Sequence, residues 1–65
     1  MKLDQFLKWK GLVSTGGEAK YLIKSGKILV NNTIELRRGR QLIDGDLVVF
    51  GKLEIIFSSS GYERP

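Results

Sequence analysis

The fold is decided by residues 15–32, which read TGGEAKYLIKSGKILVNN. Thr15 followed three residues later by Glu18 predicts the start of a helix. This pair is typical of a capping box, in which the hydroxyl takes a free amide and the carboxylate reaches back to the cap. Gly26 predicts the end of the helix, because glycine accepts the left-handed backbone found there. Between these signals an apolar stripe recurs at helical spacing, and it consists of Ala19, Leu22 and Ile23.

After Gly26 the pattern changes from helical to extended. Residues 27–30 are mainly apolar, and Asn31-Asn32 predicts a tight turn because asparagine tolerates positive φ. We therefore expect a hairpin whose second strand is residues 33–36. Two more strands are expected at 47–50 and 53–57, with turns at Asp44-Gly45-Asp46 and at Gly51-Lys52.

A shorter helix is expected before the deciding stretch. Leu3, Phe6 and Leu7 recur at helical spacing, Asp4 is a candidate cap, and Gly11 ends the pattern, so the helix should cover about residues 3–10. Two packed helices followed by a small antiparallel sheet make an α+β fold. We expect one domain over residues 1–57 and a flexible tail over residues 58–65, which are mostly small or polar.

The composition argues against several classes of function. The 65 residues include neither histidine nor cysteine, so the commonest general base, nucleophile and thiolate ligand are missing. We expect no enzyme, no cofactor and no metal, and the predicted turn accounts for Asp44 and Asp46. No apolar run approaches the roughly 20 residues that span a bilayer, and the first residues lack the apolar core of a signal peptide. The expected location is the cytoplasm.

Positive charge is concentrated in one part of the chain. Residues 8–40 carry eight cations against two carboxylates, a net charge of +6, whereas residues 41–65 carry two cations against four carboxylates, a net charge of −2. Such a concentration is typical of proteins that bind nucleic acid. An anionic membrane surface would attract it too, so charge alone leaves both partners open.

The second expected helix has the features of a phosphate-binding surface. At 100° per residue, Gly16, Gly17, Lys20 and Lys24 share a sector beside the apolar stripe, with Tyr21 at its edge. A helix start offers unpaired amides and partial positive charge to a phosphate, the glycines leave the approach open, and the lysines continue the track. The alternative is a solvated face with loop glycines, and these residues alone leave it open.

A second basic feature lies between the expected strands. Arg37, Arg38 and Arg40 surround Gly39 in what we expect to be an exposed, mobile bend. The planar guanidinium group of arginine presents several N–H donors in a geometry that suits phosphate oxygens. The alternative is a solubilising turn, and we favour binding because no acidic residue lies within the bend.

The aromatic residues indicate packing more than binding. Phe6, Phe50 and Phe57 are expected in the core, and Trp9 at the edge of the core beside Phe6. Tyr21 could stack on a base, but we expect it to pack along the edge of its helix.

These residues also resemble a known family. The resemblance is to the S-four RNA-binding domain, named after the ribosomal small-subunit protein and also called the alpha-L motif, and it covers residues 2 to about 52. Residues 15–20 together with Arg37-Arg38-Gly39-Arg40 are similar to short stand-alone bacterial members of the YaaA and YbcJ type. The matching positions are Leu3-Asp4, Leu7, residues 15–19, Leu22-Ile23, Gly26, Ile28, Val30-Asn31 and Gly45-Asp46.

The resemblance implies a compact α+β domain that binds structured RNA, often ribosomal or transfer RNA, through the second helix and the hairpin edge. Carried over by position, Thr15, Gly16, Lys20 and Lys24 fall on the helix that faces RNA. Two positions depart from the family pattern. Many members have a basic residue in place of Gly16, and Asn32 stands where glycine is usual. The catalytic domains of larger relatives have no counterpart in these residues.

The sequence thus predicts an RNA-binding protein, with structured ribosomal or transfer RNA as its partner and the ribosome as a further candidate. We expect a monomer whose cations form one continuous strip beside an open helix start. The alternative is a protein-interaction module that docks on an acidic ribosomal or replication partner. Membrane association ranks lower, since no helix offers an exposed apolar face. The expected RNA-binding residues are Lys8, Lys10, Thr15, Gly16, Gly17, Lys20, Lys24, Lys27, Arg37, Arg38 and Arg40.

Overall fold

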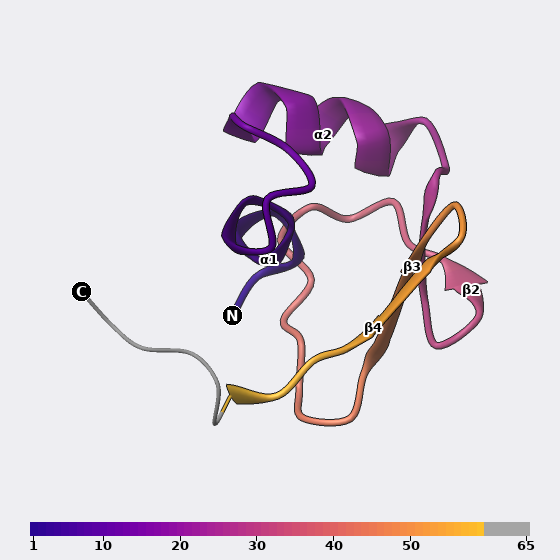
Figure 1. The fold of residues 1–65 in the computed structure, drawn as a ribbon. Helices are drawn as coiled ribbons and strands as arrows, with labels where there is room; N and C mark the ends of the chain where they lie inside the picture. Colours follow the sequence, from indigo (N-terminus) through magenta and orange to yellow (C-terminus); the bar gives the residue numbers. More distant parts are fainter. Residues whose placement is uncertain (60–65) are drawn as a thin grey trace.

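The computed structural model describes residues 1–59 and confirms the α+β fold. Two helices come first and lie to one side of a four-stranded sheet (Figure 1). The sheet order is β2-β1-β3-β4, and every neighbouring pair is antiparallel. The elements are α1 (Leu3–Trp9), α2 (Gly16–Lys24), β1 (Ile28–Val30), β2 (Thr33–Ile34), β3 (Leu47–Phe50) and β4 (Leu53–Ile56).

Both hairpin turns form as the sequence predicts. Val30 pairs with Thr33, so Asn31 and Asn32 are the two turn residues, and their φ angles of 54° and 68° are both left-handed. The second hairpin turns at Gly51-Lys52, where Gly51 has a φ of 61°. Positive φ at the turn residues matches the twist of the flanking strands, which is why asparagine and glycine stand there.

The helix starts differ in detail from the expected caps. Lys2, not Asp4, is the residue that caps α1, and its amide donates to Oε1 of Gln5 at 3.2 Å. At α2 the Glu18 amide donates to the Thr15 hydroxyl at 3.2 Å, as expected. The Glu18 carboxylate reaches one residue further back than expected and accepts from the Ser14 amide at 3.1 Å.

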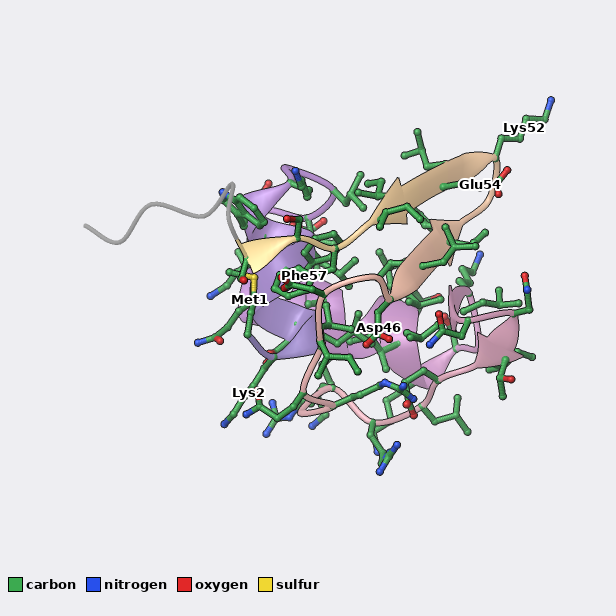
Figure 2. All side chains as sticks on the ribbon, turned by 90° about the horizontal axis from the view of Figure 1, so that it is seen from below. Met1, Lys2, Asp46, Lys52, Glu54 and Phe57 are labelled. Atoms are coloured by element: carbon green, nitrogen blue, oxygen red, sulfur yellow. The ribbon has the colours of Figure 1, made fainter. Side chains whose placement is uncertain are left out.

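One hydrophobic core joins the helices to the inner face of the sheet. Phe6 and Phe57 meet edge to face with ring centroids 5.7 Å apart, and Phe57 lies against α1 in Figure 2. Phe50, also expected in the core, packs against it but is only partly buried. The buried residues are Leu3, Phe6, Leu7, Val13, Ala19, Ile23, Ile28, Val30, Leu42, Val48 and Phe57.

The expected strand over residues 33–36 is shorter in the structure. The strand ends at Ile34, although the Glu35 amide still donates to the Ile28 carbonyl at 3.0 Å, and Glu35 is buried. Only the first two residues of the expected tail are described, and Ser59 donates to the Asp44 carboxylate from its amide at 2.9 Å and its hydroxyl at 3.2 Å. The rest of the expected tail, residues 60–65, lies outside the described residues.

Candidate nucleic-acid interface

The start of α2 is open to solvent. Gly16 and Gly17 are exposed, and a side chain added at Gly16 would meet nothing within 4 Å. The first amides of a helix have no partner inside the helix. The Thr15 hydroxyl accepts a hydrogen bond from the Glu18 amide. The amides of Gly16 and Gly17 therefore remain at an unobstructed helix tip. This tip can accept an anion at close range.

The exposed side of α2 continues from this tip. Lys20 and Lys24 are exposed, whereas Ala19 and Ile23 on the opposite side are fully buried. Tyr21 is 69% exposed, so the expectation that it packs along the helix edge was wrong. We call this surface the α2 face, and it consists of Gly16, Gly17, Lys20, Tyr21 and Lys24.

The remaining lysines of the predicted site lie at the ends of the helices. Lys8 is exposed in the last turn of α1. The Lys10 ammonium lies 4.3 Å from the ring centroid of Trp9, a cation–π contact that keeps this charge beside the indole. Trp9 itself meets Phe6 edge to face and is half-buried, which confirms its place at the edge of the core. Lys27 is exposed between α2 and β1.

The arginine segment, residues 37–40, is held in place instead of being a mobile bend. In the first turn of α1, the Asp4 amide donates to the Arg38 carbonyl at 3.1 Å, and the Leu3 amide donates to the Arg40 carbonyl at 2.9 Å. In Figure 1 the chain between β2 and β3 passes below α2 on its way to α1. The segment therefore has a fixed backbone on the helical side of the molecule.

Two of the three arginines are paired with a carboxylate that lies outside the expected bend. Glu35 accepts hydrogen bonds from Arg37 Nε at 3.2 Å, from Arg37 Nη2 at 3.1 Å and from Arg40 Nη1 at 2.8 Å. The bonds from Arg37 and then from Arg40 lower the pKa of Glu35 from its ordinary 4.5 to about 2. The carboxylate is thus charged at neutral pH, and the three arginines and Glu35 together carry a net charge of +2.

Donors on the outer side of this ion cluster remain accessible. The Arg37 side chain is 74% exposed and that of Arg40 is partly exposed. An open pocket is lined by Arg37, Gly39, Arg40 and Gln41. Nε of Arg40 is buried and has no hydrogen-bond partner among the described residues. The arrangement presents two oriented guanidinium groups at one depression of the surface.

Sequence reasoning missed Lys2 as a neighbour of the arginine segment. Lys2 forms an antiparallel β-bridge with Gln41, next to Arg40, and its side chain is exposed. Figure 2 places Lys2 at the opposite end of the molecule from Lys52, which lies at the tip of the β3–β4 hairpin. The bridge joins positions far apart in the chain, and no local signal in the sequence indicates it.

Asp44 and Asp46, near the start of β3, also have hydrogen-bond partners within the fold. The pKa of Asp46 is lowered, first by the hydrogen bond from the Ile43 amide and then by that from Asn31. The pKa of Asp44 is lowered by the two bonds from Ser59. Within residues 1–59, no group of three or more acidic side chains could hold a metal ion, and no helix is long and apolar enough to cross a membrane.

Comparison with known proteins identifies the family. Residues 1–56 match the S4 domain, and the chain therefore belongs to the S4-domain family. It is also similar to a Bacillus subtilis (strain 168) protein named "Probable ribosome maturation protein RlbA". The two are 39% identical over 57 residues, which cover 83% of this chain and 80% of that relative. No solved structure matches the chain.

Proposed function

We propose that this protein is a non-catalytic RNA-binding protein that recognises structured ribosomal RNA through contacts to the phosphate backbone. The observation that carries the proposal is the α2 face, where an open Gly-Gly helix start is followed on the same side by two exposed lysines. The S4 domain and the name of the Bacillus relative, a ribosome maturation protein, support a ribosomal target over other RNA.

The α2 face suits the backbone of folded RNA more than its bases. A phosphate at the helix tip would receive the amides of Gly16 and Gly17 together with the partial positive charge of the helix. Lys20 and Lys24 lie one and two turns further on and would reach successive phosphates. Because backbone contacts fix position and carry little sequence information, selectivity would come from the shape of the RNA.

The arginine segment would add a second contact area. Arg38 is exposed and sits between the two arginines that Glu35 holds, and Lys2 is bridged to the same segment. Lys8, Lys10 and Lys27 would provide weaker, longer-range attraction. We further propose that the protein acts as a monomer in the cytoplasm, where ribosomal RNA is available.

A matched pair of charge reversals tests the proposal. Lys20→Glu alters the α2 face, whereas Lys52→Glu makes the same change of charge at the β3–β4 turn. Both side chains are exposed, so both variants should keep the fold. Fluorescence anisotropy with ribosomal RNA hairpins should show at least tenfold weaker binding for Lys20→Glu, about 1.4 kcal/mol, and a much smaller loss for Lys52→Glu. Equal losses would show that only net charge matters, and absence of binding by the unmodified protein would end the proposal.

A second candidate function, docking on a protein, has support from the outer face of the sheet. Leu29 lies opposite both Ile34 and Val49, and Leu47 lies opposite Ile56, so these five apolar side chains share the face turned away from the core. Ile34 is 56% and Ile56 is 62% exposed. Association with purified ribosomal subunits that is lost in Ile56→Lys but kept in Lys20→Glu would favour this candidate.

A further inference from the structure

Glu35 is an unexpected residue for a surface that attracts phosphate. It is 7% exposed, lies two residues before the arginine segment, and lowers the positive charge of that segment by one. If the arginines acted only as mobile charges, this carboxylate would weaken their attraction for RNA. Its contacts with Arg37 and Arg40 indicate a different role.

The contacts fix the orientation of both guanidinium groups. Arg37 donates to the two carboxylate oxygens from Nε and Nη2, which is the two-point geometry that arginine forms with a planar carboxylate. Arg40 donates from Nη1 to Oε1, the oxygen that also accepts from Nη2 of Arg37. Each guanidinium has five N–H donors, so both retain donors after these bonds are made.

The retained donors belong to residues that line one pocket. Arg37 and Arg40 form its walls together with Gly39, which has no side chain, and Gln41, whose amide can also donate. Nothing lies within 4 Å of the position where a side chain at Gly39 would begin. The pocket is therefore open enough for a tetrahedral anion to approach the two oriented guanidinium groups.

We propose that this pocket is a discrete phosphate subsite of the RNA interface, and that Glu35 is a positioning residue that holds Arg37 and Arg40 in the geometry that binds the phosphate. The inference rests on the proposed function. Because both long side chains are held in place before the ligand arrives, they lose less conformational entropy on binding, and the cost of binding is lower. The buried carboxylate thereby increases affinity even though it subtracts charge.

The substitution Glu35→Gln tests the role of Glu35 by the sign of its effect. The variant gains one unit of positive charge, so an interface governed by charge alone would bind a ribosomal RNA hairpin more tightly. Positioning predicts the opposite, a loss of about tenfold, because an amide cannot hold two guanidinium groups as a carboxylate does. Binding would be compared at a temperature where circular dichroism shows both proteins folded, and tighter binding by Glu35→Gln would overturn the inference.

A second pair of variants avoids the buried position. Arg37→Lys and the control Lys52→Arg both keep their charge at exposed sites, so neither should disturb the fold. Arg37 makes the two-point contact with Glu35, and lysine cannot reproduce it, whereas Lys52 lies at the β3–β4 turn, outside the proposed interface. Arg37→Lys should weaken RNA binding by about five- to tenfold, and Lys52→Arg should change it by less than about twofold. Equal effects would overturn the positioning role.

Inorganic phosphate separates failure of the subsite from failure of the proposed function. In NMR spectra of the whole protein, the Nε–Hε signals of Arg37 and Arg40 should shift together as phosphate is added, and the shift should be lost in Glu35→Gln. No shift in the unmodified protein would overturn the subsite even if RNA binds. A joint shift supports the subsite even if the ribosomal RNA probe does not bind.

Discussion

The side-chain amide of Asn31 donates a hydrogen bond of 3.0 Å to the buried carboxylate of Asp46, and so ties the β1–β2 turn to the turn that begins β3. The oxygen of the same amide accepts from the Leu47 backbone, also at 3.0 Å. The Asn31 side chain thus bonds both to a buried carboxylate and to a backbone amide, while the Asn31 backbone is left-handed, at a φ of 54°. This contact fixes the sheet whose inner face supports both helices.

Loss of this contact should destabilise the protein measurably. Asn31→Gly keeps the left-handed backbone but removes the side-chain bond to Asp46, which keeps its bond from the Ile43 amide, and leaves the Leu47 amide without its partner. This loss should lower the free energy of unfolding by about 1–3 kcal/mol. Asn32→Gly is the matched control, since its φ of 68° suits glycine and should leave stability within about 1 kcal/mol. Urea denaturation measures both, and equal stability of the two variants would contradict this role for Asn31.

The exposed Tyr21 ring predicts a contribution from base stacking. Tyr21 lies on the α2 face between Lys20 and Lys24, and stacking of a base on an aromatic ring contributes about 1–3 kcal/mol. Tyr21→Ala should therefore weaken RNA binding, whereas Tyr21→Phe, which keeps the ring, should bind nearly as well as the unmodified protein. Because the side chain is exposed, melting temperatures should not change. Unaltered anisotropy titrations with Tyr21→Ala would exclude stacking.

The Glu35 ion cluster predicts a dependence of stability on pH. The pKa of Glu35 falls from 4.5 to about 2 on folding, so its contribution is complete above about pH 4.5 and is lost as the pH falls through 2. Asp44 and Asp46 act in the same direction because their pKa values are also lowered. The difference in unfolding free energy between the unmodified protein and Glu35→Gln should shrink from pH 5 to pH 2. A difference that stays constant across this range would show that the carboxylate charge is not involved.

Features that depend on neighbouring residues could be predicted from the sequence. The turns at Asn31-Asn32 and Gly51-Lys52 and the Thr15 cap of α2 are set by backbone preferences within a few residues, and all three are confirmed. The β2 strand was predicted too long, because nothing local indicates that the strand ends where Glu35 binds arginines two and five residues later.

Features that depend on the assembled fold were missed. The expected packing of Tyr21 failed because its place at the edge of the helical stripe leaves the outcome to tertiary contacts, and the core covers Ala19 and Ile23 instead. The neighbourhood of Lys2 and Gln41 arises only when the chain after β2 returns to α1. The glycine and lysine positions of the α2 face were predictable because helical periodicity alone places them together.

The salt dependence of RNA binding tests the central claim most directly. Binding of a structured ribosomal RNA would be titrated by anisotropy over a series of salt concentrations. If about five cations contact phosphates, the logarithm of the association constant should fall against the logarithm of salt concentration with a slope of roughly −3 to −5. A slope near zero would contradict recognition through the phosphate backbone.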